Sequence, residues 1–163
     1  MDPDFNKIVE LHVNDIRKIV FSYVKNHHTM EDITQEVFIS AYHNISQFRG
    51  DSSIKNWLLK IAVNKSKDYL KSWHHRKVQM THWFGKEEQA NKDTEETVLA
   101  QVRDRELAND IMQLPVKYRE VIILYYYQDL DTNEISSLLG LNVNTVKTRL
   151  IRSRDLLKRR FDF

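Results

Sequence analysis

Carboxylate, amide and histidine side chains cluster in the first quarter of the chain. Asp32, Gln35 and Glu36 follow one another at helical spacing, and His27 and His28 precede them. Carboxylates and imidazoles can bind metal ions or transfer protons. The sequence offers no second cluster for the other half of a di-metal site, and adjacent histidines in a loop are usually solvated. We therefore expect no metal or catalytic site here, and interpret the polar helix face as a binding surface for another protein.

The stretch from residue 49 to residue 77 mixes cations with aromatic rings. It carries eight basic and two acidic side chains. Single-stranded nucleic acid is bound by such a mixture, because cations contact the phosphates and rings stack on unpaired bases. Lys65, Tyr69 and Trp73 share a helix face at spacings of four residues, whereas Trp57 is in phase with an apolar stripe and is expected in the core. The alternative is an ordinary lysine-rich helix face in contact with solvent.

Residues 131–160 predict two short helices joined by a turn. Asp131 and Glu134 have the spacing of a capping box, which satisfies backbone N–H groups at a helix start. Gly140 can end the first helix in the left-handed conformation, and Asn142 can cap the second. In the second helix, five polar or basic side chains are expected to face outward: Lys147, Thr148, Arg149, Arg152 and Ser153. This pattern is typical of a helix-turn-helix, which places its second helix in the DNA major groove; the alternative is a solvated amphipathic helix.

Charge is distributed in blocks along a chain whose net charge is only +2. Residues 49–77 form one basic block, and residues 142–163, with seven basic and two acidic side chains, form another. The other segments carry more acidic than basic side chains. Two basic blocks allow contact with a phosphate backbone at two places, while the acidic faces remain available to a different partner.

Length and composition set further bounds. The 163 residues suffice for one medium domain or two small ones. The chain has no cysteine, which excludes disulfides and thiolate metal sites and fits a reducing compartment. No stretch is long and apolar enough to cross a membrane, and the acidic start, Met1 to Asp4, is unlike a secretory signal. We therefore expect a cytoplasmic protein.

Helical periodicity and the scarcity of turn-forming residues predict an all-α protein. Apolar residues follow helical spacing in four segments: 5–24, 29–45, 54–73 and 98–114. Pro115 can end the last of these helices and start the next. Only three glycines and two prolines punctuate the chain. We expect two small helical domains, 1–76 and 101–163, the second of which holds the helix-turn-helix, with a flexible acidic linker over 77–100.

Four segments, in the same order and spacing, resemble those of bacterial extracytoplasmic-function (ECF) sigma factors, a group of the sigma-70 family. They are DITQEVF at 32–38, FRGDSS at 48–53, WLLKIAVN at 57–64 and GLNVNTVKTRL at 140–150. Each segment alone is a weak signal, but the four in series span most of the chain. The resemblance implies a two-domain transcription initiation factor that binds core RNA polymerase and brings it to promoters. It implies neither a cofactor nor an enzymatic activity.

The resemblance also implies roles for individual residues. The polymerase β′ clamp would be bound through Asp32, Gln35, Glu36 and Phe38, and the C-terminal domain would bind the β flap. A base flipped from the single-stranded −10 element would enter a pocket made by Phe48, Arg49, Gly50, Asp51, Ser52, Ser53 and Asn64, beside Lys65, Tyr69 and Trp73. The duplex −35 element would be read by Asn144, Thr145, Lys147, Thr148, Arg149, Arg152 and Ser153. An anti-sigma factor is a further expected partner.

Two other classes of protein fit parts of the sequence. An autonomous regulator would use the helix-turn-helix as its reader and dimerise through the N-terminal helices, so it would bind palindromic sites. A metal-dependent helical hydrolase would use His27, His28, Asp32 and Glu36, and elemental analysis would detect its metal. A sigma factor, in contrast, is expected to be monomeric and to read asymmetric promoters.

Overall fold

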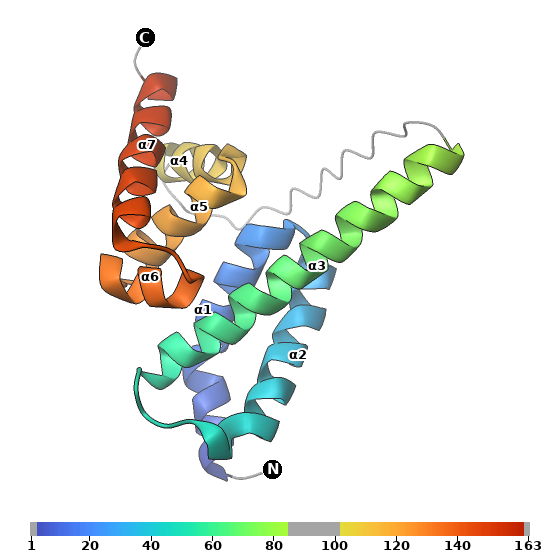
Figure 1. Ribbon diagram of the computed structural model, residues 1–163, viewed down its shortest axis with the longest axis vertical. Helices are drawn as coiled ribbons and strands as arrows, with labels where there is room; N and C mark the ends of the chain where they lie inside the picture. Colours follow the sequence, from blue (N-terminus) through green and yellow to red (C-terminus); the bar gives the residue numbers. More distant parts are fainter. Residues whose placement is uncertain (1–2, 85–101, 162–163) are drawn as a thin grey trace.

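The computed structural model describes residues 3–84 and 102–161, and every regular element in these ranges is helical (Figure 1). The elements are α1 (Pro3–Val24), α2 (His27–Asn44), the short 3-10 helix η1 (Ile45–Gln47), α3 (Ile54–Phe84), α4 (Val102–Gln113), α5 (Val116–Ile122), the π-helical turn η2 (Ile123–Tyr127), α6 (Thr132–Leu139) and α7 (Val143–Phe161). The predicted all-α fold class is confirmed.

Helices α1, α2 and α3 form the N-terminal module, in which α1 contacts both other helices and α2 contacts α3. Each helix contributes an apolar stripe whose side chains are fully shielded from water, because residues three and four apart share one face. The shielded side chains include Ile16 and Ile19 of α1, Val37 and Ala41 of α2, and Leu58, Leu59 and Ala62 of α3. Helix α2 begins at His27, two residues earlier than the periodicity indicated, since the Asn26 side chain accepts a hydrogen bond from the Thr29 N–H at 2.9 Å.

Helix α3 is longer than the sequence predicted. We expected it to end near Trp73 and the linker to begin at residue 77, whereas α3 continues to Phe84. The intervening sequence contains no glycine or proline, so nothing interrupts the helix before Gly85. The first part of the predicted linker is therefore helical, and the rest lies outside the described residues. The side chains of Trp83 and Phe84, whose role the sequence left open, also lie outside the described part of the chain.

Helices α4 to α7 form the C-terminal module, and its helix boundaries follow the predicted signals. The Asp131 carboxylate accepts a hydrogen bond from the Glu134 N–H at 2.8 Å, and the Glu134 carboxylate accepts one from the Asp131 N–H at 2.9 Å. Gly140 has a φ of +65° and ends α6, and the Asn142 side chain accepts a hydrogen bond from the Asn144 N–H at 2.8 Å. The predicted helix-turn-helix is confirmed in these details.

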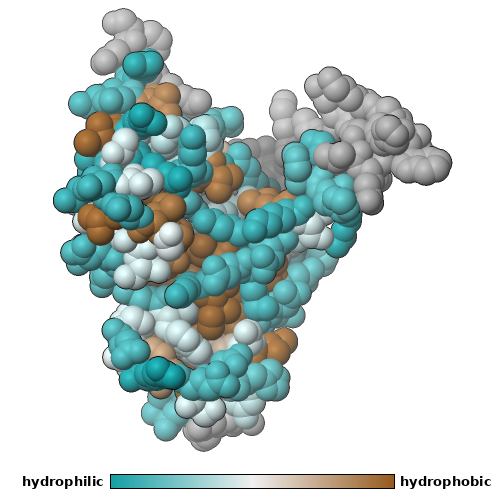
Figure 2. Space-filling model, in the orientation of Figure 1, coloured by the Kyte–Doolittle hydropathy of each residue, from teal (hydrophilic) through white to brown (hydrophobic). Residues whose placement is uncertain are grey.

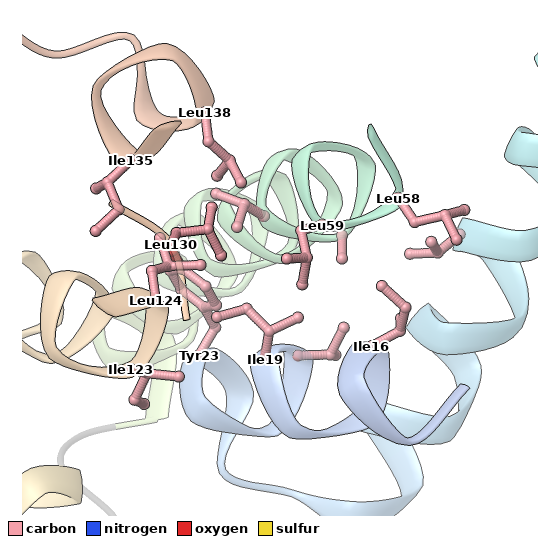
Figure 3. Packing of buried hydrophobic residues seen from close by; sticks show 14 of the residues in the cluster. Ile16, Ile19, Tyr23, Leu58, Leu59, Ile123, Leu124, Leu130, Ile135 and Leu138 are labelled. Atoms are coloured by element: carbon pink, nitrogen blue, oxygen red, sulfur yellow. The ribbon is translucent and has the colours of Figure 1, made fainter. Parts of the chain in front are cut away.

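The two modules pack against each other and share one hydrophobic core (Figure 3). Helix α3 contacts α6, and α1 contacts α5. Figure 3 shows Leu59, Ile19 and Tyr23 on the N-terminal side facing Leu124 and Leu130 on the C-terminal side. All five side chains are at most 3% exposed. Figure 2 shows that hydrophilic side chains cover most of the viewed face, with small hydrophobic areas between them.

Candidate nucleic-acid interface

The loop before α3 is shaped by local interactions among its own residues. Gly50 has a φ of +78°, a conformation that side chains with a Cβ rarely adopt. The Ser53 hydroxyl accepts a hydrogen bond from the Asn56 N–H at 3.1 Å and so caps the first turn of α3. The rings of Phe48 and Trp57 lie 5.2 Å apart, which fixes the loop against the helix. Trp57 is half-buried, as part of this contact.

A groove of about 580 Å³ runs along this loop, and we call it the loop groove. It contains five of the predicted −10 residues: Phe48, Arg49, Asp51, Ser52 and Ser53. Asn56, Trp57 and Lys60 also line it, although sequence reasoning did not assign them to the site. Helical spacing could have indicated these three residues, because positions three, four and seven after Ser53 lie on the same helix face as Ser53. The opposite wall comes from α6 of the other module and consists of Asn133, Glu134, Ser137 and Leu138.

Gly50 belongs to the loop but does not line the groove, and the other four predicted −10 residues lie along α3. Asn64 is exposed, one helical turn beyond Lys60, and does not line the groove. Lys65 and Tyr69 are half-buried. Trp73 is 45% exposed, and the Lys77 ammonium lies 4.9 Å from its ring centre. The structure therefore brings the loop residues together at one place and distributes the cations and rings of α3 beside them.

The predicted polymerase-binding face lies on α2. Asp32, Gln35 and Glu36 are exposed there, as a contact surface requires. Phe38 is only 8% exposed and packs in the core of the module, so it does not belong to this exposed face. It lies one position beyond the buried Val37, in phase with the apolar stripe of α2. Ile39, which the sequence analysis did not select, is 58% exposed.

The histidines near this face do not form a metal cluster with the carboxylates. His28 Nε2 lies 3.5 Å from the Asp32 carboxylate, and both side chains are largely exposed. His27 stacks on Phe21, with 4.7 Å between the ring centres. Among the described residues, no three histidine or acidic side chains come together as ligands of one ion. In the same residues, no helix is long and apolar enough to cross a membrane.

The outer face of α7 borders a second groove, of about 360 Å³, which we call the α7 groove. It is lined by Asn144, Thr145, Thr148, Arg149 and Arg152, all predicted −35 residues, and by Lys117 and Tyr118 of α5. Lys147 is exposed on α7 outside this groove. A hydrogen bond from Arg152, together with the charge of Lys117, lowers the pKa of the Tyr118 hydroxyl. Hydroxyls, amides and guanidinium groups are the groups that read base edges and phosphates.

Ser153 does not face outward as predicted. Its side chain is fully buried, and its hydroxyl lies 2.5 Å from the Arg149 carbonyl and 3.1 Å from the Tyr118 carbonyl. Val146, Leu150 and Ser153 recur at spacings of four and three residues, so Ser153 continues the inward stripe of α7. The sequence analysis had grouped it with the polar and basic side chains expected to face outward. Ser153 is therefore removed from the −35 surface.

Arg149 forms an ion pair with a buried carboxylate, that of Glu120. Glu120 is 3% exposed, and its carboxylate lies 3.7 Å from Arg149 Nη1 and 3.1 Å from Lys67 Nζ. The Tyr23 hydroxyl donates a hydrogen bond to the same carboxylate at 2.5 Å. Burial, and then the charge of Glu120, raise the pKa of Tyr23 well above its ordinary value. We call Tyr23, Lys67, Glu120 and Arg149 the Glu120 cluster.

Cations lie beside two grooves of this helical chain, Arg49 and Lys60 at the loop groove and Lys117, Arg149 and Arg152 at the α7 groove, and such a distribution is typical of nucleic-acid-binding proteins. Comparison with known proteins identifies the class. Residues 8–76 match the Sigma-70 region 2 family, and residues 105–157 match the Sigma-70, region 4 family.

Relatives extend this match over almost the whole chain. The chain is 33% identical over 147 residues to RNA polymerase sigma factor SigV of Bacillus subtilis, covering 90% of this chain and 84% of that one. It is 32% identical over 163 residues to ECF RNA polymerase sigma factor SigW of the same species, covering 95% and 87%. The chain therefore belongs to the sigma-70 family, as a sigma factor of the ECF group, and it directs RNA polymerase to promoters as a transcription initiation factor. Sigma factors are non-enzymatic initiation factors.

Solved structures share the fold at lower sequence identity. The sigma factor RpoE of Bartonella quintana, in a complex with the anti-sigma factor NepR, superposes with a TM-score of 0.81 at 22% identity, covering 97% of this chain and 96% of that chain. CnrH, in a complex with the cytosolic domain of CnrY, gives a TM-score of 0.67 at 23% identity, with 97% and 87% covered. The matches to both sigma regions do not favour the autonomous dimeric regulator.

Proposed function

We propose that the loop groove holds unpaired bases of the −10 element. The Phe48 and Trp57 rings offer stacking surfaces, and Arg49 and Lys60 supply cations for the adjacent phosphates. The exposed Asn64 and Trp73, with Lys65 and Tyr69 between them, extend this surface along α3. Together these residues suit a melted strand more than a duplex, because rings can stack only on bases that have left their partners.

The α7 groove reads the duplex −35 element in this proposal. Asn144, Thr145, Thr148, Arg149 and Arg152 contact base edges and the sugar-phosphate backbone. Lys147 adds a phosphate contact beside the groove. The observation that carries the proposal is the capped helix-turn-helix, because the match to sigma region 4 includes its first helix and residues 143–157 of its second.

The polar face of α2 binds the β′ clamp of core polymerase through Asp32, Gln35 and Glu36, and the C-terminal module binds the β flap. Exposure of the three side chains on one helix supports the first assignment. An anti-sigma factor is a further proposed partner, supported by the complex of the structural relative RpoE with the anti-sigma factor NepR. We place the protein in the cytoplasm, where the polymerase acts, and assign it no enzymatic activity and no cofactor.

The test is reconstituted transcription. The purified chain is added to bacterial core RNA polymerase with a library of double-stranded fragments, and the transcripts are sequenced. We expect initiation from fragments that share a two-part motif, and none with core polymerase alone. Absence of transcripts, together with selection of a palindrome by the isolated chain, would replace this proposal with the dimeric regulator.

A further inference from the structure

The α7 groove has a second wall, which comes from α5 and has no role in the proposed −35 surface. Helices α5 and α7 lie side by side (Figure 1). Lys117 and Tyr118 of α5 line the groove, and Arg152 of α7 lines it as well. Lys117 and Arg152 are exposed, and Tyr118 is half-buried. Two polar side chains of α5 are therefore available to a ligand that enters the groove.

These three side chains interact with one another, and we call them the Tyr118 cluster. Arg152 donates a hydrogen bond to the Tyr118 hydroxyl, and the Lys117 ammonium lies 5.0 Å from the centre of the Tyr118 ring. The hydroxyl of Ser153, the residue after Arg152, donates a hydrogen bond to the Tyr118 carbonyl at 3.1 Å and so joins α7 to α5. Two cations are thereby held beside one hydroxyl.

The positive charge of the Tyr118 cluster has no acidic partner among the described residues. Neither Lys117 nor Arg152 forms an ion pair with a carboxylate in that part of the chain, whereas Arg149 pairs with Glu120 in the Glu120 cluster. The hydrogen bond from Arg152, and then the charge of Lys117, lower the pKa of the Tyr118 hydroxyl. Like charges repel, and an anion bound between them removes the repulsion. The Tyr118 cluster is therefore electrostatically suited to an anion.

The position of Arg152 on α7 favours the DNA backbone over the base edges. In a helix-turn-helix, residues near the start of the second helix reach the bases. Asn144, Thr145 and Thr148 belong to the first two turns of α7, and Arg152 belongs to the third. Arg152 lies about 12 Å along the helix from Asn144, at about 1.5 Å per residue. A side chain that far along α7, next to a second helix, is placed to meet the backbone that borders the major groove.

We infer that Lys117, Tyr118 and Arg152 together bind one backbone phosphate of the −35 duplex, and that Arg152 anchors this phosphate instead of reading a base. The inference rests on the proposed role of the α7 groove. A guanidinium group has five N–H donors, so Arg152 keeps donors for the phosphate after it has bonded to Tyr118. The Tyr118 hydroxyl accepts the bond from Arg152 and donates its own proton to the phosphate. The Lys117 ammonium adds a second positive charge.

A phosphate contact and a base contact have different consequences for binding. A phosphate contact fixes the position of the protein on the duplex and carries no sequence information. Its loss should weaken binding to all −35 sequences by the same factor. Loss of a base reader should instead weaken binding to the matched sequence more than to altered ones.

The test removes single negative charges from the DNA. The full chain is assembled with core polymerase, and each phosphate of the −35 duplex is replaced in turn by an uncharged methylphosphonate. Promoter binding is measured for the wild type, Tyr118→Phe and the double variant Lys117→Met/Arg152→Met. Both cations of the double variant are exposed, so its fold should be retained. Lys158→Met is the matched control, because it removes an exposed cation of α7 that does not line the groove.

We expect one methylphosphonate position to weaken binding of the wild type and of the control by at least about threefold. The same replacement should leave binding of the double variant unchanged. Tyr118→Phe should bind all promoters about two- to tenfold more weakly, the usual effect of one lost hydrogen bond. No variant should differ from the wild type in its preference among −35 sequences or in its affinity for core polymerase without DNA.

The salt dependence tests whether both cations bind the same phosphate. The slope of log affinity against log salt concentration should be less steep by about 0.9 in the double variant than in the wild type, because one phosphate contact is lost. A change of about 1.8 would mean two separate phosphates and would overturn the shared site.

Other outcomes also overturn the inference. If the double variant responds to the same methylphosphonates as the wild type, the two cations bind no phosphate. If the double variant loses its preference for the matched −35 sequence, Arg152 reads a base. A lower affinity for core polymerase without DNA would assign the Tyr118 cluster to the polymerase. If the wild type itself neither distinguishes −35 sequences nor responds to any of these methylphosphonates, the proposed −35 role of the α7 groove fails, and the inference fails with it.

Discussion

The two candidate DNA surfaces differ in how they are built. The α7 groove lies within one module, on a helix whose start is fixed by Asn142 and whose preceding turn is fixed by Gly140. The loop groove takes one wall from the loop before α3 and the other from α6, which lie far apart in the sequence. The α7 groove therefore requires only that the C-terminal module is folded. The loop groove also requires that the C-terminal module packs against the N-terminal module.

The shared core between the modules gives the largest expected effect. Leu59 is fully buried in the hydrophobic cluster to which both modules contribute side chains. Leu59→Ala should lower the free energy of unfolding by about 2–5 kcal/mol, the usual cost of a cavity in a packed core. Urea unfolding followed by circular dichroism measures it. Leu11→Ala, at a site 74% exposed, should change stability by less than about 0.5 kcal/mol. Two separate transitions in the wild type would contradict a shared core.

The α7 groove is tested by removing its central guanidinium. Arg149→Ala should weaken discrimination between correct and altered −35 sequences by about 1–3 kcal/mol, the scale of a lost bidentate base contact. Binding of the polymerase complex to matched and mismatched promoters measures this. Lys158→Ala, at an exposed cation near the end of α7, serves as the control. A uniform, salt-dependent loss over all sequences would instead place Arg149 on a phosphate.

Mutations on the exposed face of α2 should change the affinity for core polymerase and leave both grooves intact. Gln35→Ala should weaken binding to core polymerase by about 1–2 kcal/mol, as for a side chain near the centre of an interface. Its stability should change little, since Gln35 is exposed. Sedimentation or fluorescence titration with core polymerase measures the affinity, with Glu10→Ala on α1 as the control. A large fall in melting temperature would show that Gln35 is structural.

The smallest expected effect is a pH dependence of the N-terminal module. Burial lowers the pKa of His12 below its ordinary value of 6.5, so the folded state favours the neutral ring. Above about pH 6.5 the ring is neutral in both the folded and the unfolded protein, and its contribution to the free energy of unfolding is fully present. It is lost as the pH falls through the lower pKa of the folded protein. The melting temperature should therefore fall less steeply below pH 6.5 in His12→Gln than in the wild type; equal slopes would exclude this role.

Sequence reasoning succeeded best where structure is local. The capping box of Asp131 and Glu134, the left-handed Gly140 and the Asn142 cap each depend on residues within a few positions, and all are present. Sequence reasoning was less successful where the type of a residue suggested one side of a helix and its position in the helical repeat placed it on the other. Phe38 and Ser153 were assigned to surfaces by motif or by polarity, yet both lie on inward stripes. The phase of the neighbouring apolar residues places both side chains inward.

The sequence by itself determined that the chain is helical, where the helix-turn-helix begins and turns, and which family it belongs to. These follow from periodicity, capping and short motifs, which act over a few residues. Only the tertiary structure decided that α6 borders the loop groove and that Glu120 meets both Tyr23 and Lys67. Contacts between residues far apart in the chain depend on how the modules pack, and no local pattern encodes that packing.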